Sequence, residues 1–106
     1  AKLVLTPRDT AALPGDVSGE LGPRSVAGAV WSACVPVPLR NAKVVLTDAN
    51  ALATLLNIAD AKDHDLPKLL GGTMLPTGAV SAAFNYCGWQ FGSFAGQLGD
   101  GAALSL

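Results

Sequence analysis

The sequence is short of charge. Aspartate, glutamate, lysine and arginine make up 14% of its 106 residues, whereas roughly 25% is usual for a globular domain. Its seven basic residues are scattered singly, and they form no basic stripe of the kind that a nucleic-acid backbone requires. A net charge of −1 leaves little electrostatic repulsion between copies. The composition therefore predicts no nucleic-acid partner and favours a protein that works in an assembly.

Cysteine is scarce as well. The chain has Cys34 and Cys87, far fewer than a disulfide-stapled secreted scaffold carries. Both lie in apolar surroundings, which predicts buried free thiols, and a disulfide between them remains open. The first residues, AKLVLTPRD, lack the apolar core of a signal peptide. We therefore expect a mature or cytosolic chain.

The length is near the commonest size of one domain, so we predict a single domain over residues 1–106. Within it, residues 7–25 combine prolines and glycines with small and charged residues. That composition buries too little apolar area to order itself. It predicts a long N-terminal loop or arm.

One helix is predicted over about 48–62. Apolar residues recur there at helical spacing, and Asp48 can cap the first turn. Residues 66–72 allow at most one further helical turn, because Gly71 and Gly72 stop it.

Short strands are predicted on both sides of this helix, at 2–6, 42–47 and 101–106. In the apolar run 25–40, Pro36 and Pro38 remove two backbone donors and confine its end to an edge strand or an extended connection. Strands and helices do not alternate as in a parallel α/β enzyme. The predicted fold class is a small α+β domain with mostly antiparallel short strands packed on one main helix.

No residue from Leu69 to Gly99 is charged, and this segment holds most of the aromatic side chains. As a helix it would align Gly88, Gly92 and Gly96 and raise a membrane span. Frequent polar interruptions and many glycines argue against the helix. We predict two glycine-punctuated strands, with a bulge or tight turn at Gly88 that would bring the rings of Phe84, Tyr86, Trp89 and Phe91 together, and no membrane partner.

The aromatic side chains are the predicted interface. Aromatic rings with polar tips are common anchors of subunit contacts, and the chain offers Trp31, Phe84, Tyr86, Trp89, Phe91 and Phe94. The alternative is a pocket in which these rings bind a small apolar or carbohydrate ligand.

Groups that carry catalysis or hold metals are few. Asp60, Asp63, His64 and Asp65 lie close in sequence, but the glycine and glutamate positions of an EF-hand loop do not match. A solvated helix end is the preferred interpretation, and an enzyme that uses His64 with Asp63 or Asp65 remains the alternative. No serine has a hydrolase context and no loop has a phosphate-binding pattern. We therefore predict no catalytic residue, metal or cofactor.

These observations favour a structural protein that is not an enzyme. The predicted role is a self-associating subunit, or a decoration or minor coat protein of a virus or phage particle. Its predicted partners are copies of itself or a larger protein shell, and its predicted location is a virion or the cytoplasm. The alternative function is a monomeric ligand-binding or carbohydrate-binding module.

Overall fold

The protein is described by a computed structural model that covers residues 3–60, 62, 65–101 and 103–106. The chain divides into two compact units. Unit 1 comprises Ala1–Thr6 and Pro36–Ala79, and unit 2 comprises Pro7–Val35 and Val80–Leu106. The single domain predicted over 1–106 stays a prediction. The described residues form three short helices and four strands.

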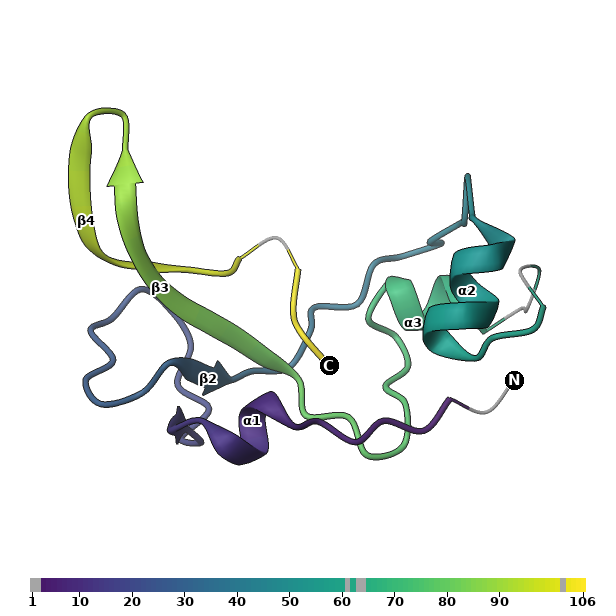
Figure 1. Ribbon diagram of the computed structural model, residues 1–106, viewed down its shortest axis with the longest axis horizontal. Coiled ribbons are helices and arrows are strands. Elements are labelled where there is room, and N and C mark those ends of the chain that lie inside the picture. The colour runs from purple at the N-terminus through teal and green to yellow at the C-terminus, as the bar shows by residue number, and fades with distance from the viewer. Residues whose placement is uncertain (1–2, 61, 63–64, 102) are drawn as a thin grey trace. The chain divides into compact units, whose positions relative to one another are not determined.

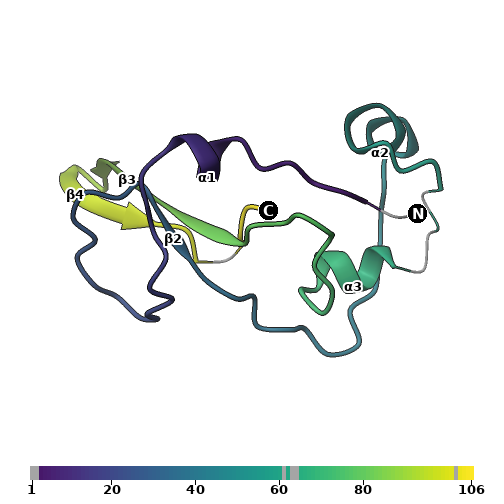
Figure 2. The same ribbon diagram turned by 90° about the horizontal axis from the view of Figure 1, so that it is seen from below.

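Unit 2 is built on a four-stranded sheet. Its strands are β1 (Gly15–Asp16), β2 (Trp31–Ala33), β3 (Ala82–Gln90) and β4 (Ser93–Gly99), in the order β1-β2-β3-β4. The pair β1–β2 is parallel, whereas β2–β3 and β3–β4 are antiparallel (Figures 1 and 2). The predicted fold class, α+β with mostly antiparallel strands, is therefore confirmed. The sheet and the longest helix belong to different units, so the packing of one on the other stays a prediction.

The core of unit 2 lies where β2 meets the start of β3. Trp31 and Ala82 are buried, with 6% and 0% of their surfaces exposed. The indole Nε1 of Trp31 donates a hydrogen bond to the Leu13 carbonyl at 3.0 Å, so the one polar atom of the ring is satisfied. Ala82 exchanges two backbone hydrogen bonds with Ser105, of 3.0 and 2.9 Å. In its described part, the strand predicted at 101–106 is therefore reduced to one bridge, at Ser105.

The predicted arm 7–25 contains regular structure. Helix α1 (Asp9–Ala12) and strand β1 both fall within it. Strand β1 is held by its pairing with β2, and the Val30 amide donates to the Pro14 carbonyl at 2.9 Å. This segment gains its order from residues about fifteen positions further along the chain, which its own composition does not reveal.

Unit 1 contains helices α2 (Ala49–Leu56) and α3 (Leu66–Leu70). Asp48 caps α2 as predicted, because its side chain accepts a hydrogen bond from the Ala51 amide at 2.9 Å. The helix ends earlier than the predicted residue 62. Asn57 adopts a left-handed conformation (φ 54°), which ends the helix and turns Ile58 into the core with 4% of its surface exposed. Helix α3, which stops at Gly71, confirms the predicted extra turn.

Two strands predicted in this unit are wrong. Residues 42–47 form no strand, and Val45 and Leu46 are 96% and 89% exposed. Their β propensity therefore has no neighbouring surface to pack on. The strand predicted at 2–6 is, in its described part, a single bridge from Val4 to Thr77. The end 34–39 of the predicted 25–40 run is an extended connection, as its two prolines require.

Candidate interface on the hairpin β3–β4

The hairpin β3–β4 closes through a two-residue turn. Gln90 pairs with Ser93, and the turn residues Phe91 and Gly92 have φ angles of 51° and 78°. Positive φ at both central residues defines a type I′ turn, which matches the twist of the flanking strands. The two glycine-punctuated strands predicted in this segment are therefore confirmed.

A bulge interrupts the hairpin where the sequence predicts one, but on the other strand. Tyr86 pairs with Leu98 and Gly88 with Ala95, so two residues of β4, Gly96 and Gln97, oppose Cys87 alone. Because the extra residue is in β4, strand β3 keeps its alternation of faces. The expectation that the four rings of 84–91 come together is therefore wrong.

Within the hairpin, one pair of aromatic rings is in contact. Trp89 and Phe94 are cross-strand partners, and their ring centroids lie 5.8 Å apart at an interplanar angle of 62°. Edge-to-face geometry of this kind is favourable for aromatic pairs. Both rings nevertheless stay largely in solvent, with 75% of Trp89 and 56% of Phe94 exposed.

The other predicted interface residues are placed differently. Phe91 at the turn is fully exposed and Tyr86 is half exposed, whereas Phe84 is partly buried. Trp31 belongs to the core of unit 2. The exposed part of the predicted interface therefore consists of Tyr86, Trp89, Phe91 and Phe94, which we call the hairpin aromatics.

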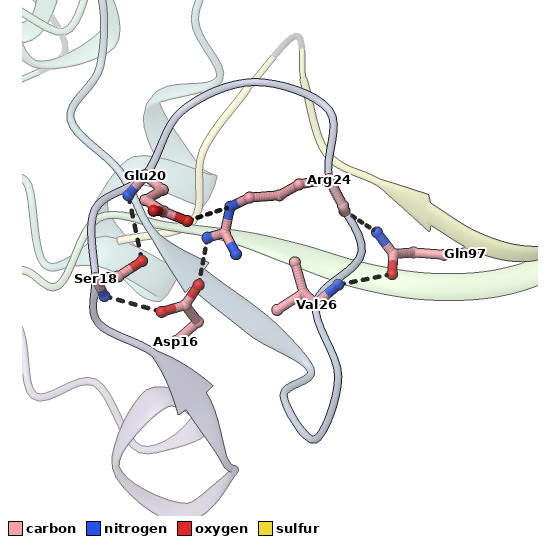
Figure 3. A network of polar contacts seen from close by, with 6 residues as sticks. All are labelled: Asp16, Ser18, Glu20, Arg24, Val26 and Gln97. Carbon is pink, nitrogen blue, oxygen red and sulfur yellow. Dashed lines mark hydrogen bonds and ion pairs between the residues drawn. The ribbon is translucent and has the colours of Figure 1, made fainter.

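A polar network ties the loop 16–26 together beside β4 (Figure 3). The Arg24 guanidinium donates to the Asp16 carboxylate and lies 3.7 Å from the Glu20 carboxylate. Asp16 also accepts a hydrogen bond from the Ser18 amide at 2.9 Å. This amide and the Arg24 side chain lower the pKa of Asp16 from 3.8 to about 2, because both stabilise the carboxylate.

Gln97 joins this loop to the hairpin. Its side-chain amide donates to the Arg24 carbonyl at 2.6 Å, and its oxygen accepts from the Val26 amide at 3.1 Å (Figure 3). Gln97 is one of the two bulge residues of β4, and a bulge commonly redirects a side chain. Sequence analysis missed this contact, because no spacing in the chain marks residues more than seventy positions apart as neighbours.

Both cysteine thiols are free. Cys34 is partly buried and Cys87 is exposed, so the expectation of two buried thiols is wrong for Cys87. Cys87 stands opposite the bulge of β4, and the structure contains no disulfide between the two residues.

The acidic cluster is described in part, because Asp63 and His64 lie outside the described residues. The Asp60 carboxylate accepts from the Lys62 amide at 2.9 Å, and Asp65 pairs with the Lys68 ammonium at 3.4 Å. Among the described residues, no three histidine, cysteine, aspartate or glutamate side chains are placed to hold a metal ion. In the same part of the chain, no helix has the length and apolar character needed to cross a membrane.

Comparison with known proteins gives a consistent result. The family model described as "Protein adenylyltransferase SelO" matches residues 24–106. The zebrafish protein adenylyltransferase SelO-1, mitochondrial, is 48% identical over 96 residues, which cover 89% of this chain. The human protein adenylyltransferase SelO, mitochondrial, is 44% identical over 97 residues and 88% of the chain. The protein nucleotidyltransferase YdiU of Tolumonas auensis is 39% identical over 95 residues and 89% of the chain.

The matched residues are a small part of these relatives. They cover 14% of the zebrafish and human proteins and 18% of the Tolumonas protein. No solved structure matches the chain.

These matches overturn the functional predictions. The relatives are named as enzymes that transfer a nucleotide to proteins, so the prediction of a structural protein without enzymatic activity is wrong. The predicted virus or phage coat role, the alternative ligand-binding module and the predicted partners, copies of itself or a larger shell, are contradicted with it. The family model matches residues 24–106, and the zebrafish relative is 48% identical. The chain therefore belongs to the SelO family of protein adenylyltransferases.

Proposed function

We propose that the full-length protein that carries these residues is a protein adenylyltransferase. It transfers an adenylyl group from a nucleotide donor to a side chain of a protein substrate. The observation that carries this proposal is the family match over residues 24–106, which contains β2, β3 and β4 complete. The relatives named protein adenylyltransferase and protein nucleotidyltransferase support the same chemistry.

The part played by this chain is to supply a sheet to the enzyme. The family match begins at Arg24, whose carbonyl accepts from Gln97. It therefore starts at the point where the loop 16–26 is joined to β4. Helix α1 and strand β1 precede the match, whereas β2, β3 and β4 lie within it together with helices α2 and α3.

The location that we propose is inside a cell, in the cytoplasm or in a mitochondrion. The zebrafish and human relatives carry the word mitochondrial in their names, and this supports a cellular place of action. The virion predicted from composition has no support among these relatives.

The test uses the full-length protein with ATP labelled at either the α-phosphate or the γ-phosphate. An adenylyltransferase places the α-label on a protein acceptor and leaves the γ-label in the released pyrophosphate. Label transferred from the γ-position would show phosphoryl transfer and would overturn the proposal. Absence of protein labelling from both donors, in a preparation shown to be folded, would overturn it too.

A further inference from the structure

Phe91 is an unusual residue for its position in a type I′ turn. A type I′ turn favours Asn-Gly, because Asn and Gly tolerate positive φ, whereas a bulky aromatic residue at φ 51° is an outlier. Among the described residues, the other two non-glycine residues with positive φ are asparagines, Asn41 and Asn57. Phe91 has no compensating contact within the described residues, since its side chain is fully exposed. Backbone strain of this kind commonly marks a functional position.

Apart from the hydrogen bonds of Gln97 with Arg24 and Val26, the outer half of the hairpin has little support from the other described residues. Strand β2 pairs with residues 82–84 of β3 and the Asn85 amide donates to the Val30 carbonyl at 2.8 Å, whereas residues 86–90 pair with β4 alone. The turn therefore stands at the end of a two-stranded ribbon (Figure 1). A two-stranded ribbon is marginally stable in water unless a further strand or another surface packs against it.

The residues of the two-stranded ribbon indicate what kind of surface would pack against it. No charged residue occurs between Leu69 and Gly99, and the hairpin aromatics are 50% to 104% exposed. A charged partner would gain no ion pair here, whereas an apolar partner would remove the rings of Trp89, Phe91 and Phe94 from water. The matching surface is therefore apolar.

The relatives indicate where such a surface is found. The chain corresponds to 14–18% of the length of the zebrafish, human and Tolumonas proteins. More than four-fifths of the polypeptide of these relatives therefore lies outside the matched residues. A surface of the same polypeptide needs no second molecule and no loss of translational freedom on contact.

We propose that the hairpin aromatics form an intramolecular plug, with Phe91 at its tip, that inserts into an apolar site on the part of the full-length polypeptide outside residues 1–106. The contact offsets the strain of the turn and supports the two-stranded ribbon. The inference rests on family membership and not on adenylyl transfer, so stability and proximity test it without an activity assay.

The first test replaces Phe91 by asparagine in the full-length protein. Phe91→Asn gives the turn its preferred Asn-Gly sequence, so a hairpin without a partner is stabilised by the change. If the plug forms, the substitution lowers the melting temperature instead, by more than about 2 °C, because the contact of the Phe91 ring is lost. The matched control is Val17→Asn, a change of a residue that is 78% exposed and precedes the family match. It leaves the melting temperature unchanged.

The second test places the photo-crosslinking residue benzoylphenylalanine at position 91, where it retains the aromatic ring. The full-length protein is prepared as a mixture of isotopically light and heavy copies, so crosslinks within one molecule are distinguished from crosslinks between two. The plug predicts crosslinked peptides of a single isotope, from outside residues 1–106.

Other outcomes overturn the proposal. A melting temperature that rises or stays unchanged with Phe91→Asn shows that the turn has no partner. An equal loss with Val17→Asn shows that the effect is not specific to the hairpin. Crosslinks of mixed isotope identify a second copy, crosslinks to residues 1–106 identify a contact within this chain, and crosslinks to another protein identify a separate partner.

Discussion

Single residues decide how tightly unit 2 packs. Gly15 lies beside Trp31 in the parallel pair β1–β2, and a Cβ atom added at Gly15 would fall 1.9 Å from the indole ring. The ring is buried and hydrogen-bonded to Leu13, so a shift away from an added methyl group would disturb this packing and the hydrogen bond. The absence of a side chain at position 15 is therefore what allows the indole to lie against β1.

We expect Gly15→Ala to destabilise the protein by about 1–3 kcal/mol, the usual cost of overpacking a core. The measurement is the free energy of unfolding by chemical denaturation. Gly88→Ala is the matched control, because nothing lies within 4 Å of the added methyl group and its φ is not positive. Equal losses from both substitutions would contradict the packing of Trp31 against β1.

The folded structure lowers the pKa of Asp16. Its pKa in the folded state is about 2, below the ordinary 3.8, because the Ser18 amide and Arg24 favour the carboxylate. A carboxyl group with a lowered pKa stabilises the fold above the unfolded pKa, and this contribution is lost as the pH falls from about 4 to 2.

We therefore expect Asp16→Asn to lower the melting temperature at neutral pH and to bring wild type and variant together as the pH falls towards 2. An NMR titration of the Asp16 carboxyl carbon measures the pKa directly. Glu20→Gln serves as the control, since the Glu20 side chain is 71% exposed and screened by water. An Asp16 pKa of about 4 would contradict the network in Figure 3.

At the scale of elements, the local signals that agree with the structure are caps, stops and turns. Asp48 before an apolar periodic run, and Gly71 after a short one, fix a helix start and a helix end. The other helix and strand boundaries depend on which side chains become buried. Residues 42–47 have strand propensity and no partner, and the end of α2 depends on the left-handed Asn57 that allows Ile58 to be buried.

Helix α2 gives the clearest test at this scale. Removing the cap by Asp48→Ala leaves the Ala51 amide without its side-chain acceptor, and we expect a loss of about 1 kcal/mol in the free energy of unfolding. Asp48→Ser retains an acceptor oxygen and is expected to restore most of this stability. If alanine and serine behave alike, the cap does not hold the start of the helix.

The hairpin shows which structural features can be predicted from the sequence alone. Two strands and an irregularity near Gly88 could be predicted from the alternation of residues and from the glycines. The strand that carries the extra residue could not, because it depends on the pairing of Gly96 and Gln97 with β3. The contact of Gln97 with Arg24 and Val26 has the same origin, and no local pattern encodes it.

For the whole molecule, the low charge predicts an assembly of separate subunits, and the family match contradicts the viral shell proposed for it. A surface without charge indicates contact with other protein, and composition does not distinguish a second copy from the rest of the same polypeptide. The chain corresponds to 14–18% of the length of its relatives. The low charge and the uncharged segments 25–39 and 69–99 predict an assembly for this reason, and Phe91 is fully exposed among the described residues.

Transfer of an adenylyl group to proteins is the activity that we propose for the full-length protein. The most direct measurement is mass spectrometry of a protein acceptor after incubation with the full-length protein and ATP. We expect an added mass equal to one adenylyl group on an acceptor side chain, and no added mass when ATP is omitted. An added phosphoryl group, or an acceptor unchanged by the folded enzyme, would contradict it.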